Sequence, residues 1–280
     1  MNKILLLLLT AVLGIAPAQA GDMRRLSVNG IERTYYLHVP TGLRSGAPLV
    51  IMLHGRDDDG KTDVDRYGWE RVANGNRFVV AGPDAPTLHA GRAPSRENYT
   101  MWNSEPGTPG DIAKSDDTAF IAAMIDDIAR TDGIDLRRVY VAGFSSGGHM
   151  ANRLGHEISG RLAAIAISGA QRVLYSQPPS RGIPILFSAG DQDENTPMEG
   201  QRLLVDDWRK LDGCPATQSI SAPRNVVMEV SGPCHDGSEV RYILMQGVDH
   251  KWPTEKPINL TRTTWEFFKR FSLPTAPGRN

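Results

Sequence analysis

Short apolar runs recur along the chain and alternate with segments in which apolar residues return every three or four positions. Two runs, at 48–55 ("PLVIMLHG") and 77–85 ("RFVVAGPDA"), are nearly continuous, which is typical of central strands buried on both faces. Four later runs have the same form: "VYVAG" at 139–143, "LAAIAISG" at 162–169, "IPILFSAG" at 183–190 and "VRYILMQG" at 240–247. The segment 26–39 predicts a β-hairpin, because Asn29 and Gly30 suit the positive φ angles of a tight turn.

Three further segments predict amphipathic helices: 115–133, 199–213 and 259–271. The first has four apolar residues on one face, and Gly133 suits its C-terminal end. In the second, Leu204, Trp208 and Leu211 are predicted to form the apolar face. Strands that alternate with helices predict an α/β fold with a mostly parallel central sheet, flanked by helices on both faces. In such sheets, ligands bind beyond the carboxyl ends of the strands.

One long segment, 86–114, lacks periodicity and is rich in Gly, Pro and Ser. A loop of this length in a compact domain is usually disordered or shapes a binding site. Tyr99 and Trp102 favour a binding site, because large aromatic residues are unusual in a solvated connection.

The N-terminal end has the order of a secretory signal peptide. Lys3 is followed by the apolar run "ILLLLLTAVLGIA" and by the small-residue pattern "AQA" at 18–20. We therefore expect residues 1–20 to be removed and residues 21–280 to form one catalytic domain, secreted to the periplasm or the medium. After cleavage no long apolar run remains, so no membrane association is expected.

Charge and cysteine content narrow the possible partners. The formal net charge is −1 and no basic stripe is present, which argues against nucleic acid as a partner. The chain has two cysteines, Cys214 and Cys234, and in an oxidising compartment we expect them to form a disulfide. No cofactor and no metal is expected, and the oligomeric state is not predicted.

The sequence "GFSSG" at 143–147 fits the pattern G-x-S-x-G, with Ser145 at its centre. A predicted strand precedes it and helix-forming residues follow, which is the context of a nucleophile on a sharp strand-to-helix turn. Gly143 and Gly147 would leave room for the close backbone approach that such a turn requires. Ser146 does not fit, because the residue two positions before it is Phe144.

A serine nucleophile needs a base and an orienting acid, which in this architecture follow in the order Ser, Asp or Glu, His. His250 is the histidine that follows the last predicted strand, so we expect it to be the base. The acid is expected in the loop at 191–197; we favour Asp193, because it lies a few residues past the strand end, and Asp191 remains the alternative.

The transition state of acyl transfer also needs donors for an oxyanion. The N–H of Ser146 at the start of the helix is one candidate, and the N–H of Arg56, after the His–Gly of "MLHGRDDDG", is the other. Trp102 and Trp252 are candidate substrate-binding residues, although tryptophans that pack loops onto the core explain them equally well.

In order and spacing, five segments resemble the esterase family that includes the polyhydroxybutyrate depolymerase catalytic domains and the bacterial feruloyl and acetylxylan esterases. They are "PLVIMLHG", "DDTAFIAAMIDDI", "DLRRVYVAGFSSGGHMANRL", "SAGDQDENTP" and "GVDHKWP". The resemblance implies an α/β-hydrolase fold with Ser145 as nucleophile, Asp193 as acid and His250 as base. The late cysteine pair also resembles that of the family.

Some positions depart from the family pattern, which puts the substrate pocket in doubt. Arg56 stands where the family often has Cys, and Val248 and Asp249 replace glycines that usually precede the catalytic histidine. The family's His–Gly before the acid loop is Ala189–Gly190 here.

Together these features predict a secreted serine esterase that acts on an oligomeric or polymeric soluble ester. Hydroxyalkanoate oligomers or polyester, and feruloyl or acetyl esters of plant walls, are the expected substrates. The alternatives are a carbohydrate- or polymer-binding protein without catalytic activity on a hydrolase scaffold, and a serine peptidase.

Overall fold

The computed structural model describes residues 21–89, 98–107 and 115–275. The expected signal peptide, residues 1–20, lies outside the described residues, as do parts of the predicted loop at 86–114.

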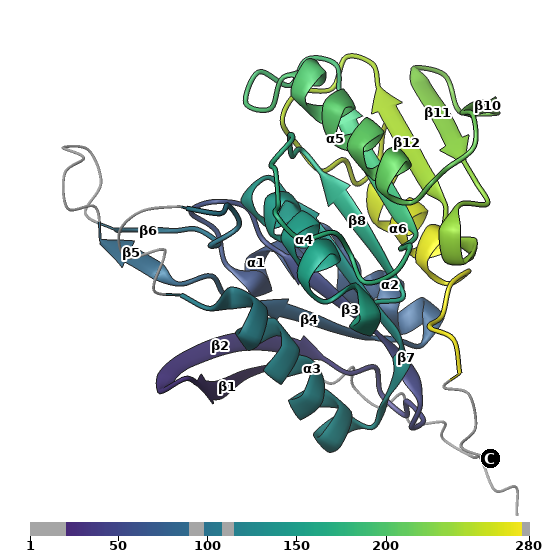
Figure 1. Cartoon of the computed structure of the whole chain (residues 1–280). Helices are drawn as coiled ribbons and strands as arrows, with labels where there is room; N and C mark the ends of the chain where they lie inside the picture. Colours follow the sequence, from purple (N-terminus) through teal and green to yellow (C-terminus); the bar gives the residue numbers. More distant parts are fainter. Residues whose placement is uncertain (1–20, 90–97, 108–114, 276–280) are drawn as a thin grey trace, which may run out of the picture.

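A ten-stranded sheet runs through the molecule in the order β1-β2-β4-β3-β7-β8-β9-β12-β11-β10 (Figure 1). Its strands are β1 (Asp22–Val28), β2 (Ile31–His38), β3 (Ala47–Leu53), β4 (Val79–Pro83), β7 (Ile134–Phe144), β8 (Ala164–Ser168), β9 (Ile185–Gly190), β10 (Gln218–Ile220), β11 (Val226–Ser231) and β12 (Val240–Met245). A separate hairpin consists of β5 (Thr87–His89) and β6 (Asn98–Thr100).

The central strands, from β4 to β12 in the sheet order, are all parallel. Antiparallel strands extend the sheet at both ends, with β1 and β2 on one side and β11 and β10 on the other. The predicted hairpin is confirmed, and its turn has positive φ at Asn29 (52°) and Gly30 (79°). The mostly parallel sheet predicted from the apolar runs is therefore confirmed.

Helices cover both faces of the sheet (Figure 1). They are α1 (Gly60–Arg66), α2 (Trp69–Asn76), α3 (Asp117–Asp132), α4 (Ser146–Glu157), α5 (Met198–Leu211) and α6 (Leu260–Phe268), with short 3-10 turns η2 (Ser159–Arg161) and η3 (His235–Gly237). The three predicted helices correspond to α3, α5 and α6, and α3 ends as expected at Gly133, which has φ 65°.

Alternate residues of each central strand point into two separate hydrophobic clusters, as the two-residue period of a strand requires. In β3, Leu49 and Ile51 belong to the cluster that includes side chains of α3, α4 and α5, whereas Val50 and Met52 belong to the one that includes side chains of α1, α2 and α6. Leu211 of α5 does not join the core as predicted, because it is 39% exposed near the end of its helix.

The expected disulfide is present. Cys214 and Cys234 are bonded and link the end of α5 to the start of η3. The bond closes a loop that contains the antiparallel strands β10 and β11, so it ties this edge of the sheet to α5.

Candidate active site

Ser145 lies at the junction of β7 and α4, in a conformation that serine rarely adopts. Its φ is 55° and its ψ is −119°. A Cβ on Gly143 would lie 2.0 Å from the Gly147 carbonyl oxygen, and a Cβ on Gly147 would lie 2.0 Å from the Leu53 carbonyl oxygen. Glycine is therefore required at both flanking positions. The tight turn holds Ser145 in a strained conformation at the carboxyl edge of the sheet.

The structure brings Ser145, His250 and Asp193 together. His250 Nε2 lies 2.9 Å from Ser145 Oγ, and His250 Nδ1 lies 2.7 Å from Asp193 Oδ2. In a neutral imidazole, a proton on Nδ1 is donated to the carboxylate, which leaves Nε2 free to accept the serine hydroxyl proton. The arrangement is that of a nucleophile, a base and an acid.

Asp193 is held in place by its own loop. Its Oδ1 accepts the backbone N–H groups of Asn195 (3.0 Å) and Thr196 (2.9 Å), and its Oδ2 accepts the Thr196 hydroxyl at 2.7 Å. Asp191, the alternative acid, accepts instead the N–H of Gly247 at 2.7 Å. Of these two aspartates, Asp193 is therefore the one that contacts His250.

The loops that carry Asp193 and His250 follow the neighbouring parallel strands β9 and β12, so both emerge at the same edge. Two backbone hydrogen bonds join them: the Asp191 N–H donates to the Met245 carbonyl (3.2 Å) and the Gln192 N–H to the Val248 carbonyl (2.9 Å). The imidazole and the carboxylate are consequently fixed relative to each other by backbone atoms as well as by their own hydrogen bond.

The ring of His250 sits in a narrow space. Its centroid is 4.8 Å from that of Phe144, and a Cβ on Gly169 would lie 3.0 Å from the imidazole Cε1. Gly169 also has φ 57°, which disfavours any larger residue. No local sequence signal indicates that Gly169 is needed, because the need arises from a contact with a residue 81 positions away.

The two candidate oxyanion donors lie on either side of Ser145. Ser146 is the first residue of α4, where a backbone N–H has no acceptor within its own helix. Arg56 follows Gly55, whose Cβ position is 3.7 Å from Ser145 Cβ. Both residues line the same cavity as Ser145 and His250.

The peptide of Arg56 is held by hydrogen bonds on both sides. The Gly55 N–H donates to Asp63 Oδ2 (3.2 Å), and the Asp57 N–H donates to the Thr100 carbonyl (3.0 Å). Asp63 is fully buried; burial, together with the nearby charge of Asp58, raises its pKa to about 7. The position of the candidate donor thus depends on a buried carboxyl group.

His54 stabilises the loop of Gly55 and Arg56 through its buried ring. It is fully buried, its Nδ1 lies 2.6 Å from the Gly55 carbonyl oxygen, and its Nε2 accepts the Ala85 N–H at 2.9 Å. Burial lowers the pKa of His54, so the neutral ring with its proton on Nδ1 fits both contacts.

The cavity in front of Ser145 has a volume of about 580 Å³ and is largely polar. Its polar walls include Arg56, Asp58, Arg66, Glu105, His149 and Gln171. Its apolar surface comes from Tyr67, Met101 and Phe144. Arg66 donates two hydrogen bonds to Asp58, so these two charges compensate each other.

His149 of α4 also lines this cavity. Its Nδ1 lies 3.2 Å from the Ser145 carbonyl oxygen, and its Nε2 accepts the Gln171 N–H at 3.2 Å. Burial lowers its pKa, which favours the neutral ring. It lies one turn of α4 after Ser145, so helical spacing was the signal that could have placed it here.

Neither tryptophan offers a flat surface to a ligand, which corrects the substrate-binding interpretation of Trp102 and Trp252. Trp102 is 0% exposed and donates its indole N–H to the His54 carbonyl (3.0 Å). Trp252 is 5% exposed and donates to Thr261 Oγ1 (2.9 Å). Both indoles pack loops onto the core, and Tyr67, which stacks on Trp252, is the ring that reaches the cavity.

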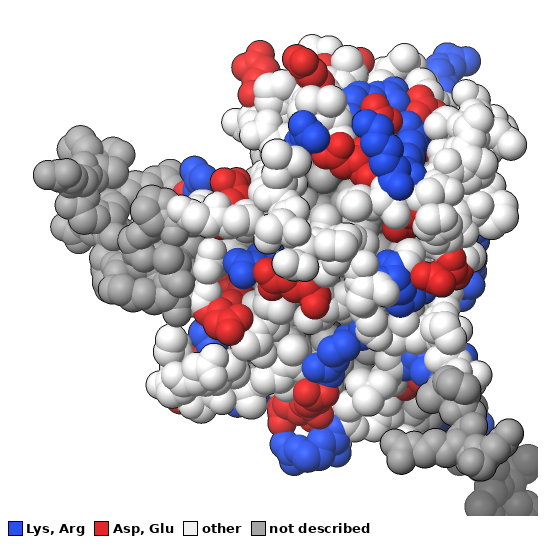
Figure 2. Space-filling view, viewed as in Figure 1, with Lys and Arg blue, Asp and Glu red and all other residues white. Residues whose placement is uncertain are grey.

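Within the described residues, no group of three or more His, Cys, Asp or Glu side chains is arranged to hold a metal ion. The helices of this part of the chain are also too short or too polar to span a bilayer. On the face drawn in Figure 2, Lys and Arg side chains are interspersed with Asp and Glu.

Several characterised proteins are similar to this chain. The bifunctional acetylxylan esterase/xylanase XynS20E of Neocallimastix patriciarum is 25% identical over 87% of this chain and 34% of its own length. Feruloyl esterase D of Neurospora crassa is 26% identical over 97% of this chain and 98% of its own. Poly(3-hydroxyalkanoate) depolymerase C of Paucimonas lemoignei is 31% identical over 41% of this chain and 26% of its own.

The chain spans 34%, 46% and 57% of the length of three curated relatives. No model of a known protein family matches it. Among solved structures, the acetyl xylan esterase from Aspergillus awamori superposes with a TM-score of 0.67 at 17% identity, over 89% of this chain and 99% of that one. The predicted α/β-hydrolase fold is confirmed, and the chain is similar to feruloyl esterases, acetylxylan esterases and a poly(3-hydroxyalkanoate) depolymerase.

Proposed function

We propose that this protein is a serine carboxylic-ester hydrolase that works through an acyl-enzyme. The observation that carries the proposal is the continuous hydrogen-bonded series from Asp193 through His250 to Ser145, with separations of 2.7 and 2.9 Å. Distances in this range allow a proton to pass from the serine hydroxyl to the imidazole during attack.

In the proposed reaction, Ser145 Oγ attacks the ester carbonyl carbon while His250 Nε2 accepts the hydroxyl proton. Asp193 stabilises the imidazolium and keeps the ring in the required tautomer. The oxyanion lies between the N–H groups of Ser146 and Arg56, each of which would contribute about 10²–10³ in rate. Collapse of the intermediate expels the alcohol with the proton of His250, and a water molecule then releases the acid by the same steps.

The lining of the cavity favours esters whose alcohol or acid part carries hydroxyl groups. Arg56, Glu105, His149 and Gln171 offer polar contacts near Ser145, and the apolar surface is limited to a few side chains. Feruloyl or acetyl esters of plant-wall sugars fit such a surface better than hydroxyalkanoate oligomers, whose chains lack free hydroxyl groups except at one end. Sugar esters are therefore the proposed substrates.

We also propose that the protein acts outside the cytoplasm. The disulfide between Cys214 and Cys234 supports this location, because such bonds persist mainly in oxidising compartments.

The direct test is hydrolysis of p-nitrophenyl acetate and butyrate by the wild type, Ser145→Ala and Ser146→Ala. Removal of the nucleophile should lower kcat by about 10⁴-fold or more. Ser146→Ala is the matched control: it deletes a neighbouring hydroxyl, which accepts the backbone N–H of Trp102 at 3.3 Å, but keeps the backbone N–H of residue 146. It should retain activity within about tenfold. Equal rates for the wild type and Ser145→Ala would refute the proposal.

The substrate class is tested separately, with acetylated xylo-oligosaccharides, methyl ferulate and 3-hydroxybutyrate dimers at equal concentrations. A kcat/KM that is highest for the hydroxybutyrate dimer would exclude sugar esters as the preferred class while leaving the esterase mechanism intact.

A further inference from the structure

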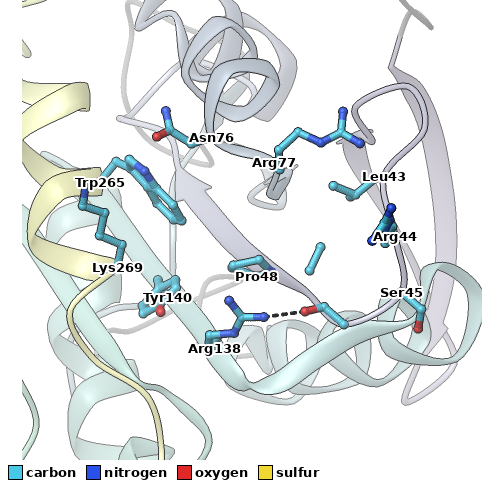
Figure 3. A pocket seen from close by; sticks show the side chains of 12 residues that line it. Leu43, Arg44, Ser45, Pro48, Asn76, Arg77, Arg138, Tyr140, Trp265 and Lys269 are labelled. Atoms are coloured by element: carbon cyan, nitrogen blue, oxygen red, sulfur yellow. Dashed lines mark hydrogen bonds between the residues drawn. The ribbon is translucent and has the colours of Figure 1, made fainter.

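A second large cavity lies at the amino ends of the central strands, opposite to the cavity at Ser145. Figure 3 shows the residues that line it. Its volume is about 600 Å³, and it is formed around Ala47 and Pro48 at the start of β3 and Arg138 in β7. Arg56 and Ser145 follow the carboxyl ends of these same strands. Because a strand rises about 3.3 Å per residue, the length of β3 separates the two cavities by roughly 20 Å. We call the second one the basal cavity.

Four basic side chains line the basal cavity, and each comes from a different element (Figure 3). Arg44 precedes β3, Arg77 follows α2, Arg138 belongs to β7 and Lys269 follows α6. Among the described residues that line it, none is an Asp or a Glu. This differs from the face in Figure 2, where both signs are interspersed.

Two of these cations are oriented by backbone carbonyl oxygens, and one of the two also pairs with a carboxylate. Arg77 donates to the carbonyl oxygens of Thr41 (2.9 Å) and Gly42. Arg138 donates to the Gly46 carbonyl (2.5 Å) and, through its Nε, to Asp135 Oδ2 at 2.7 Å. Carbonyl groups orient a guanidinium without cancelling its charge, so both guanidinium groups are set in position and the charge of Arg77 stays available to a ligand.

The other two cations, Lys269 and Arg44, add to the positive charge of the cavity. Lys269 pairs with Glu266 at 2.5 Å, and the side chains of both are about half exposed, so the pair is weak and can be exchanged for a ligand. Arg44 is exposed and makes no ion pair with any residue that the structure describes. Within the described residues, the ion-pair partners of these four cations are Asp135 and Glu266, and neither lines the cavity.

The size and the neutral lining indicate what kind of anion fits. The cavity volume of about 600 Å³ is in the range of small-molecule binding sites. It is far larger than the volume of one inorganic anion, which is of the order of a few water molecules at about 30 Å³ each. Asn76 uses its amide NH₂ on the Val72 carbonyl, and Ser45 uses its hydroxyl on the Gly133 carbonyl. Both therefore present oxygen acceptors, which suit the hydroxyl groups of a sugar.

We propose that the basal cavity binds the carboxylate- or sulfate-bearing sugar units of an acidic polysaccharide. The cations surround the hollow and contact the anionic groups, while Asn76 and Ser45 accept hydrogen bonds from ring hydroxyls. The protein then holds an acidic polymer on the side opposite to its catalytic cavity. The proposal concerns binding alone and does not depend on the esterase activity.

The test is isothermal titration calorimetry on residues 21–280. The ligands are trigalacturonic acid, xylotriose, sodium phosphate and sodium sulfate, each titrated separately. We expect saturable binding of trigalacturonic acid, at least tenfold weaker binding of the small anions, and no binding of the neutral xylotriose. Raising NaCl from 0.05 to 0.5 M should weaken the binding, because the contacts are between charges.

Arg44→Glu and Lys269→Glu should each weaken trigalacturonic acid binding by about tenfold or more, the size expected for a hydrogen bond to a charged group. Arg224→Glu, an equal change of charge in the exposed turn before β11, is the control and should leave the affinity unchanged. Hydrolysis of p-nitrophenyl acetate should be the same in all three variants.

Three results would overturn the proposal: no saturable binding of trigalacturonic acid at millimolar concentration, equal binding of phosphate or sulfate, or an affinity that Arg44→Glu and Lys269→Glu leave unchanged. The second of these would reduce the cavity to a site for small inorganic anions.

Discussion

The two edges of the parallel strands are built in different ways. At the carboxyl edge, backbone packs directly on backbone: a Cβ on Gly147 would lie 2.0 Å from the Leu53 carbonyl oxygen, and one on Gly190 would lie 2.1 Å from that of Val248. At the amino edge, long side chains such as Arg77 and Arg138 surround an open hollow and are oriented by carbonyl oxygens. Proton transfer needs distances fixed within a few tenths of an ångström, whereas attraction of a charge does not.

The comparison predicts that single changes at the carboxyl edge have large effects. The largest is expected for Asp193→Asn, which removes the acceptor that selects the tautomer of His250. We expect kcat for a p-nitrophenyl ester to fall by about 10³–10⁴-fold.

Asp191→Asn is the matched control in the same loop. Asp191 contacts the Gly247 N–H and not His250, so kcat should change only a few-fold. Comparable losses in the two variants would show that the whole loop, and not the carboxylate of Asp193, controls the imidazole.

The second prediction concerns the packing of the turn. Gly147→Ala places a methyl group against the Leu53 and His54 carbonyl oxygens, and we expect a loss of about 3 kcal/mol or more in the free energy of unfolding. Gly75→Ala in α2 meets no atom within 4 Å and should stabilise the protein by about 0.5–1 kcal/mol. Urea denaturation of both variants measures the difference, and effects of the same sign and size would contradict the contrast between packed and open glycine positions.

The third prediction uses Asp63, the buried carboxyl group that accepts the Gly55 N–H beside the candidate oxyanion donor Arg56. The pKa of Asp63 is about 7 in the folded protein and close to 3.9 in an unfolded chain. The folded state therefore binds more protons between these values, so the contribution of Asp63 to stability falls as the pH rises through this range. Between pH 5 and pH 7 the free energy of unfolding of the wild type should fall by about 2 kcal/mol relative to Asp63→Asn, as measured by urea titration.

Asp63→Asn keeps an oxygen to accept the Gly55 N–H and should retain esterase activity, whereas Asp63→Ala leaves that N–H without its acceptor and should lower kcat. Parallel stability curves for the wild type and Asp63→Asn would mean that Asp63 is already ionised at pH 5.

The same contrast explains which features could be predicted from the sequence. The central strands, the hairpin at Asn29 and Gly30, and the turn around Ser145 have local signals, because each depends on residues within a few positions. His250 and Asp193 could be placed because they follow strand ends in a fixed chain order. The strands β10 and β11 were missed, since their partly exposed residues form no clear apolar run.

Other features depend on partners that are distant in the chain. Trp102 is buried because its indole N–H finds the His54 carbonyl, and nothing near Trp102 indicates this acceptor. The basal cavity draws its basic residues from positions 44 to 269, and no spacing in the sequence connects them. Local sequence patterns therefore predict the turn at Ser145, but they do not predict the tertiary contacts that determine the shape of either cavity.

The smallest effect is expected at the amino edge. Arg44 is exposed and makes no ion pair with the described residues, so Arg44→Glu should change the free energy of unfolding by no more than about 0.5 kcal/mol. The same substitution is expected to weaken trigalacturonic acid binding, which separates recognition from folding at this edge. If urea denaturation showed that Arg44→Glu lowers the free energy of unfolding by more than about 1 kcal/mol, Arg44 would support the fold. The amino edge would then be constrained in the same way as the carboxyl edge.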